Sequence, residues 1–137
     1  VRRFRAAGCA MSLRSPLGKV IGRGSAKQGV SHWWGQRLSA VALAFLGLWF
    51  VLQVTGLNAY DYDSVRAWIG SGVTPVLLVQ LIAALAWHSA LGVQVVLEDY
   101  VHAKAIKLAA LVASIFFHVF VAVAGSYAVL RIAFTTT

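Results

Sequence analysis

Residues 87–100 read WHSALGVQVVLEDY, and this stretch indicates both a fold and a site. A lone histidine, His88, lies deep in an apolar segment, Gly92 follows one helical turn later, and Asp99 and Tyr100 stand where the segment becomes polar. An imidazole inside a bilayer is costly unless it has a partner. The stretch therefore predicts a ligand site within the membrane and a second site at the membrane surface.

The composition is that of a membrane protein. Of 137 residues, 60% are hydrophobic and only 12% are charged, and the mean hydropathy is +0.78. A soluble domain carries about 25% charged residues. The excess of apolar residues therefore predicts that much of the surface contacts lipid or the other helices of a larger bundle. The single Cys9 excludes a disulfide within the chain and any cysteine-based metal cluster, including an iron–sulfur cluster.

Three apolar runs predict an all-α integral membrane fold with three transmembrane helices. The runs cover residues 38–57, 73–97 and 108–134. Each reaches the length of about 20 residues that a helix needs to cross a bilayer core, and lipid offers the backbone no other way to satisfy its polar groups. Residues 58–72 have loop composition, with an interfacial turn expected at 66–69, and residues 98–107 form a polar turn. The predicted organisation is a basic segment, 1–37, followed by a membrane anchor domain, 38–134.

The net charge of +8 is gathered before the first apolar run. Lys104 and Lys107 add positive charge to the second loop, whereas Arg66 is the only basic residue of the first. Basic residues beside a span set its topology more often than they bind nucleic acid. The N-terminus and the second loop are therefore predicted to face the cytoplasm, or the matrix in a mitochondrion, with the C-terminus opposite. The early basic residues are Arg2, Arg3, Arg5, Arg14, Lys19, Arg23, Lys27 and Arg37.

The first ten residues allow more than one interpretation. Met11 is a plausible start, and residues 1–10 are then an over-extended reading frame or an alternative initiation. An arginine-rich, acid-poor N-terminus also resembles a mitochondrial transit peptide. A cleaved secretory signal is not expected, because the first apolar run begins only near residue 38.

The helix face around His88 is compatible with a flat ligand. At about 100° per residue, Ala84, Gly92, Val95 and Asp99 fall within roughly 40° of His88, and the face is mostly small. Neutral imidazole is a good axial ligand for haem iron. The alternative is a histidine hydrogen-bonded to another helix, with Gly92 as a close-packing residue.

For the remaining polar and aromatic residues, anchoring at the membrane interface or packing is an alternative to a functional role. Asp99 and Tyr100 are either an interfacial anchor pair or a pocket in which a tyrosine hydroxyl donates to a quinone carbonyl and a carboxylate feeds protons. His118 is expected to hydrogen-bond within the bundle, and Ser39 to be a small residue at a helix contact. The interfacial histidines and tryptophans are expected to contact headgroups: His32, His102, Trp33 and Trp34.

Two motifs of the chain resemble those of a known family. The pattern of His88, Gly92 and then Asp99–Tyr100 at the end of a second membrane helix resembles the small hydrophobic membrane-anchor subunit of succinate dehydrogenase (respiratory Complex II). Residues 31–40, SHWWGQRLSA, are similar to the start of helix one in bacterial members of that family. The resemblance covers roughly residues 24–132.

The resemblance implies a set of roles. The three helices would pack with a partner anchor subunit, the other membrane subunit of that enzyme, into a haem-binding helix bundle. His88 would supply one axial ligand to a haem b whose other ligand comes from the partner anchor subunit. Tyr100 would hydrogen-bond ubiquinone with Asp99 in the same neighbourhood, Arg37 would pair with a haem propionate, and Gly92 would belong to the haem pocket.

The resemblance also implies further partners and a location. The chain would anchor the flavoprotein and iron–sulfur subunits in the bacterial inner membrane and help to pass electrons from succinate to quinone, in the tricarboxylic acid cycle and in electron transport. It would be part of an enzyme without being an enzyme alone, with no flavin of its own, and its other contacts would be membrane lipid and not nucleic acid. The alternatives are a mitochondrial inner membrane, a haem-free anchor of a fumarate-reductase-like complex, and an unrelated three-helix membrane protein.

Overall fold

The computed structural model describes the backbone of residues 26–135 and the side chains of residues 30–135, which form four helices. Three of these helices are long and apolar enough to cross a membrane, with mean hydropathies of 2.0, 1.9 and 2.3. The prediction of an all-α integral membrane fold with three spans is confirmed. The helices are α2 (Ala26–Thr55), α3 (Tyr62–Ile69), α4 (Thr74–Tyr100) and α5 (Lys104–Thr135).

The first long helix begins earlier than the apolar run indicates. Helix α2 starts at Ala26, so the predicted boundary between residues 37 and 38 falls inside it. A helix satisfies its own backbone hydrogen bonds and can therefore continue past the hydrocarbon core into polar surroundings. At 1.5 Å per residue, α2 is about 45 Å long, against a core of about 30 Å. The predictions made for Cys9, Met11 and the basic residues 2–27 lie outside the described side chains.

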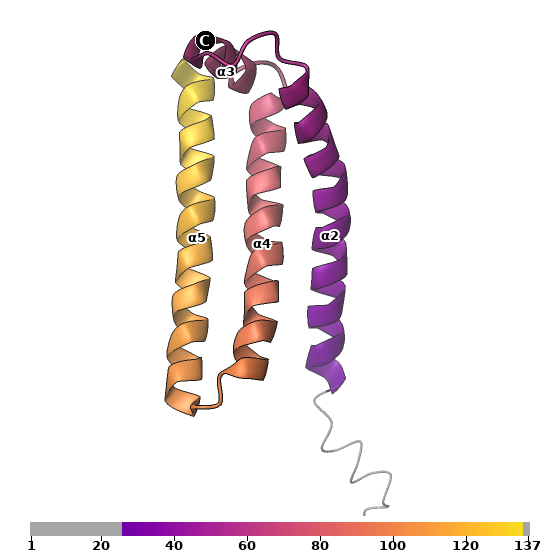
Figure 1. Ribbon diagram of the computed structural model, residues 1–137, viewed down its shortest axis with the longest axis vertical. Coiled ribbons are helices and arrows are strands. Elements are labelled where there is room, and N and C mark those ends of the chain that lie inside the picture. The colour runs from indigo at the N-terminus through magenta and orange to yellow at the C-terminus, as the bar shows by residue number, and fades with distance from the viewer. Residues whose placement is uncertain (1–25, 136–137) are drawn as a thin grey trace, which may run out of the picture.

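The three long helices lie side by side, with α4 in the middle (Figure 1). Helix α4 packs against both α2 and α5, whereas α2 and α5 do not pack against each other within residues 26–135. The start of α2 and the α4–α5 turn lie at one end of the bundle, and α3 lies at the other end with the end of α5 (Figure 1). This alternation agrees with the predicted topology, and the side that faces the cytoplasm stays a prediction.

Short polar segments close the two ends of the bundle. The interfacial turn predicted at 66–69 is part of α3, which Asp61 caps by accepting a hydrogen bond at Oδ2 from the backbone N–H of Ser64 (3.2 Å). Hydrogen bonds from Ser64 hold the pKa of the Asp61 carboxyl below its ordinary value. At the other end, Lys107 Nζ donates to the Glu98 carbonyl (2.7 Å) across the α4–α5 turn.

Helix α3 is also tied to the end of α5. Arg66 Nη2 donates to the carbonyl oxygen of Thr135 (3.3 Å), one of the last carbonyls of α5. A cation is favourable at a helix C-terminus, where carbonyls lack helical partners. This contact holds the first loop over the far end of the helix bundle.

The protein has almost no interior of its own. Among the described residues only Leu78 and Val129 are buried apolar side chains, and Ser39 and Thr74 are the buried polar ones. Large apolar residues such as Phe45, at 73% exposed, cover the outer faces. A single layer of apolar helices with such faces must be covered by lipid or by further helices.

Gly125 offers a test of the packing between α4 and α5. A Cβ at Gly125 would lie 3.4 Å from two carbons of Ile82, which is ordinary contact, but a longer side chain has no room there. Overpacking of this kind costs about 1–3 kcal/mol. We expect Gly125→Leu to lower the thermal stability of the protein purified in detergent and Gly125→Ala to leave it nearly unchanged. Equal stability of the two variants would show that this helix contact is not tight.

Candidate functional site

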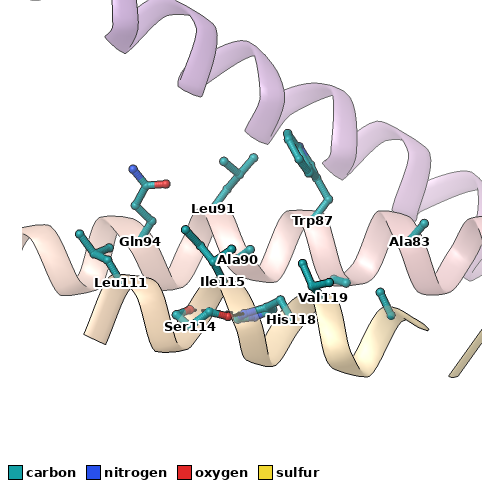
Figure 2. Close-up of a pocket in the computed structure, with 12 residues that line it drawn as sticks. Ala83, Trp87, Ala90, Leu91, Gln94, Leu111, Ser114, Ile115, His118 and Val119 are labelled. Carbon is teal, nitrogen blue, oxygen red and sulfur yellow. Dashed lines mark hydrogen bonds between the residues drawn. The ribbon is translucent and has the colours of Figure 1, made fainter. Parts of the chain in front are cut away.

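Helices α2 and α4 come close together near the middle of α4. A Cβ at Gly35 would lie only 3.3 Å from Leu91 Cδ1 and 3.7 Å from Trp87 Nε1. Figure 2 shows Trp87 and Leu91 on the side of α4 that points toward α2. Without a hydrophobic force between helices in lipid, small residues that allow such approach carry helix association. Gly35 therefore lets polar groups on α2 reach α4.

The close approach joins His88 to two residues of α2. The His88 Nδ1 lies 3.0 Å from Ser39 Oγ, and the Ser39 hydroxyl donates to the backbone carbonyl of Gln36 (3.1 Å). The side-chain amide nitrogen of Gln36 lies 3.4 Å from His88 Nε2. With the Gln36 amide in this orientation its nitrogen donates, which assigns the lone pair to Nε2 and the proton to Nδ1. His88 is thus a neutral histidine with its Nε2 lone pair directed away from Ser39.

A groove of about 360 Å³ lies beside this nitrogen. A Cβ at Gly92 would meet only the Gln36 amide, at 4.0 Å, so a side chain there would occupy open space. The Gln36 Oε1 atom is buried and has no hydrogen-bond partner among the described residues. The groove is lined by Gln36, His88, Ser89, Gly92, Val93, Val96 and Leu97.

These features fit a flat group that brings its own metal. The groove offers one ring nitrogen, one unsatisfied amide oxygen and a glycine where a large group can approach the backbone. No group of three or more metal-ligating side chains exists in the part of the chain that the structure describes. A metal at His88 would therefore need most of its ligands from outside these side chains, as the nitrogens of a macrocycle such as haem supply them.

The other predicted site residues lie apart from His88. The Arg37 guanidinium stacks over Trp33, 5.5 Å from the ring centroid, and Arg37 lies about 100° around α2 from Gln36. Asp99 lies on the same face of α4 as His88 but about 16 Å further along the helix axis. Tyr100 is 78% exposed at the end of α4. The roles predicted for these residues stay predictions.

Asp99 and Tyr100 do share one end of the bundle with the start of α2. The end of α4 and the beginning of α2, which carries Trp33 and Trp34, lie at the same end of the molecule (Figure 1). The backbone carbonyl of Tyr100 pairs with His102 Nδ1 (3.1 Å), while the phenol of Tyr100 remains exposed. A headgroup at this surface could reach the phenol from outside.

His118 forms a second polar cluster between α4 and α5. Its Nδ1 lies 2.7 Å from the Ser114 carbonyl and must therefore carry the proton, and its Nε2 lies 3.1 Å from Ser89 Oγ. The prediction that His118 hydrogen-bonds within the bundle is confirmed. His118 and Ser114 line a groove of about 490 Å³ between the two helices, and Figure 2 shows both residues on α5. Both nitrogens of His118 are thus satisfied by the chain itself.

Sequence reasoning missed the roles of Gln36 and Ser39. Ser39 was expected to be only a small residue at a helix contact, yet it is 7% exposed and bonded to His88. The signal was present as two polar residues three positions apart within α2, which places them on one face of the helix. Only the rotation of α2 relative to α4 shows that this face meets His88.

The fold and the site together define an integral membrane protein that holds a neutral histidine within a helix bundle. The chain matches the family described as succinate dehydrogenase/fumarate reductase transmembrane subunit over residues 11–125. It therefore belongs to this family, and within it to the hydrophobic membrane-anchor subunits of succinate dehydrogenase. The family match excludes the alternative of an unrelated three-helix membrane protein.

Two curated relatives illustrate the similarity. The succinate dehydrogenase hydrophobic membrane anchor subunit of Rickettsia bellii is 32% identical over 119 residues, which is 85% of this chain and 93% of the relative. The subunit of the same name from Paracoccus denitrificans is 28% identical over 117 residues, or 85% and 90% of the two chains. No solved structure matches the chain at a significant level.

The hydrogen bond between Ser89 and His118 can be tested by removing the hydroxyl. Ser89→Ala leaves the Nε2 lone pair of His118 without a donor, and hydrogen bonds between membrane helices contribute about 0.6–1.7 kcal/mol. We expect a lower melting temperature of the protein in detergent. Ser126→Ala removes a hydroxyl of α5 that has no hydrogen bond to His118 and serves as the control. Equal effects of the two variants would contradict a specific role for Ser89.

Proposed function

We propose that this chain binds haem b jointly with a partner anchor subunit and contributes to the site where ubiquinone is reduced with electrons from succinate oxidation. The observation that carries the proposal is the neutral His88, whose Nδ1 is bonded to Ser39 and whose Nε2 faces a groove at mid-helix. An intramembrane ionisable residue indicates a functional site. Family membership supports a role in a succinate dehydrogenase complex.

The residues around His88 would hold the haem in distinct ways. His88 Nε2 would donate its lone pair to the iron, Gly92 would leave room for the macrocycle, and the Gln36 amide would turn from Nε2 to a new partner. Arg37, in the first half of α2, is proposed to pair with a propionate. The haem, when bound, supplies a one-electron redox centre within the membrane. The chain itself contributes a fixed, uncharged ligand in apolar surroundings.

The quinone site is proposed at the end of α4. The exposed phenol of Tyr100 can donate a hydrogen bond to a quinone carbonyl, which orients the headgroup and favours the developing negative charge on its oxygen. Asp99 is exposed beside it and can pass protons from water to the reduced headgroup. Both residues stand where a lipophilic headgroup meets the aqueous phase.

The partners and the location are proposed from the surfaces of the bundle and from the relatives. The apolar faces of a single helix layer must be covered by lipid or by further helices, and the partner anchor subunit would supply such helices beside the His88 groove. The iron–sulfur and flavoprotein subunits would sit at the end of the bundle that carries Tyr100. The relatives from Rickettsia and Paracoccus support a bacterial inner membrane, and the basic residues before the first span favour a cytoplasmic N-terminus.

A haem-free anchor, as in a fumarate-reductase-like complex, is the second candidate. The observation that favours it is the contact between the Gln36 amide and His88 Nε2, which gives both ring nitrogens a partner within the chain. That contact is long at 3.4 Å, and it leaves Gln36 Oε1 unsatisfied. The haem-binding role accounts for these two features better than a purely structural one.

The proposed ligand is tested by the visible spectrum of the complex. We expect the complex isolated from membranes through a tag on this chain to show a b-type haem band in the dithionite-reduced minus oxidised spectrum. His88→Ala removes the lone pair and should remove most of this band while the chain remains inserted. His118→Ala, which changes a histidine already satisfied within the chain, should keep it. A normal band in His88→Ala would refute the ligand assignment, and no band in the intact wild-type complex would favour the haem-free anchor.

The quinone site is tested by comparing two electron acceptors. Tyr100→Phe removes the hydroxyl donor and should lower ubiquinone reduction by about 10-fold or more, since an oxyanion donor contributes a few kcal/mol. Succinate oxidation with an artificial soluble acceptor should be unchanged, because that reaction does not use the membrane end of the site. Tyr60→Phe, on an exposed tyrosine of the first loop, is the control. Equal loss with both acceptors would argue against a quinone role for Tyr100.

A further inference from the structure

We infer that Ser39 is a positioning residue that selects the iron-binding tautomer of His88 and tunes the electron density of its Nε2. This inference rests on the proposed haem-binding function and concerns how the chain prepares the ligand. A neutral histidine has one proton for two nitrogens, and it can bind a metal only through the nitrogen that lacks it. The chain therefore has to place the proton on Nδ1.

The three contacts around His88 are mutually consistent in one arrangement of hydrogens. The Ser39 hydroxyl has a single hydrogen, and the Gln36 backbone carbonyl, 3.1 Å away, can only accept it. Ser39 Oγ is then an acceptor toward His88 Nδ1 at 3.0 Å, so Nδ1 must donate. With the Gln36 amide nitrogen turned toward the ring, the reverse tautomer would place the Nε2–H against that nitrogen and leave two donors facing each other. The hydrogen-bond relay therefore runs from Nδ1 through Ser39 to the Gln36 carbonyl.

The position of Ser39 makes this relay rigid. Its side chain is buried at 7% exposure, on the face of α2 that approaches α4. The accepting carbonyl belongs to the residue three positions earlier in the same helix, so the direction of the hydroxyl is set by helical geometry. The approach at Gly35 keeps α2 within reach of the ring.

The relay also affects the electronic properties of the ligand. A hydrogen bond accepted from the distal N–H of a metal-binding histidine fixes the ring orientation and raises the basicity of the other nitrogen. Ser39 does this with a neutral oxygen, so no charge is buried at mid-membrane, where charge is expensive. A more basic Nε2 favours ferric over ferrous iron. Removal of Ser39 Oγ should therefore loosen the haem and raise its midpoint potential.

The test uses the whole complex isolated from membranes through a tag on this chain. Redox titration of the haem band measures the midpoint potential, and transfer of haem to an excess of a scavenging apoprotein measures retention. We expect Ser39→Ala to bind haem about 10- to 100-fold more weakly, which is the usual effect of losing such a partner, and to titrate at a higher potential. Ser39→Thr keeps a hydroxyl that can bond the same carbonyl and should restore both values.

Controls separate the relay from general effects on packing and from the proposed function. Ser126→Ala removes a hydroxyl from α5 that has no hydrogen bond to His88, and it should leave the potential and the retention at wild-type values. Wild-type values in Ser39→Ala would overturn the inference while leaving His88 as a ligand. Failure of Ser39→Thr to restore either value would also overturn it, because the hydroxyl would then not be the active group. A wild-type complex without haem would instead overturn the proposed function itself.

Discussion

The site depends on the close approach of α2 to α4 at Gly35. Lipid provides no hydrophobic force between these helices, so van der Waals contact and hydrogen bonds must hold them together. The absence of a side chain at Gly35 allows both, because Leu91 and Trp87 fill the space on one side and Ser39 reaches His88 on the other. A larger residue at this position would separate the hydroxyl from the ring and leave an imidazole without its partner in the bilayer.

The two histidines of the membrane region, His88 and His118, differ in how well the chain satisfies their ring nitrogens with hydrogen bonds. His118 Nδ1 donates a hydrogen bond to a backbone carbonyl of its own helix, and its Nε2 accepts one from the Ser89 hydroxyl. Both ring nitrogens therefore have hydrogen-bond partners within the chain. At His88, a firm bond at Nδ1 contrasts with a long contact at Nε2 from an amide whose oxygen is unsatisfied. A histidine that serves packing needs no such asymmetry. The difference supports the proposal that His88, and not His118, binds an external ligand.

The sequence predicted the three spans because an apolar run inside a bilayer can only form a helix. It singled out His88 as a candidate ligand residue because an ionisable side chain inside such a run is costly without a partner. The sequence placed the start of the first apolar run at residue 38, whereas helix α2 begins at Ala26. A helix can begin before its apolar residues do. The sequence did not predict the role of Ser39. Which α2 residues meet His88 depends on the rotation of one helix against the other, and that rotation is set by side-chain contacts distant in sequence.

Because the three long helices form a single layer, the groove beside His88 is open on one side. The described residues contain no group of three or more metal-ligating side chains. If haem is held jointly with a partner subunit, as proposed, cofactor binding and subunit assembly would stabilise each other through the same contacts. The relay from His88 through Ser39 stays within this chain. Its own residues would thus prepare the nitrogen that it contributes, and the other half of the coordination would come from the partner.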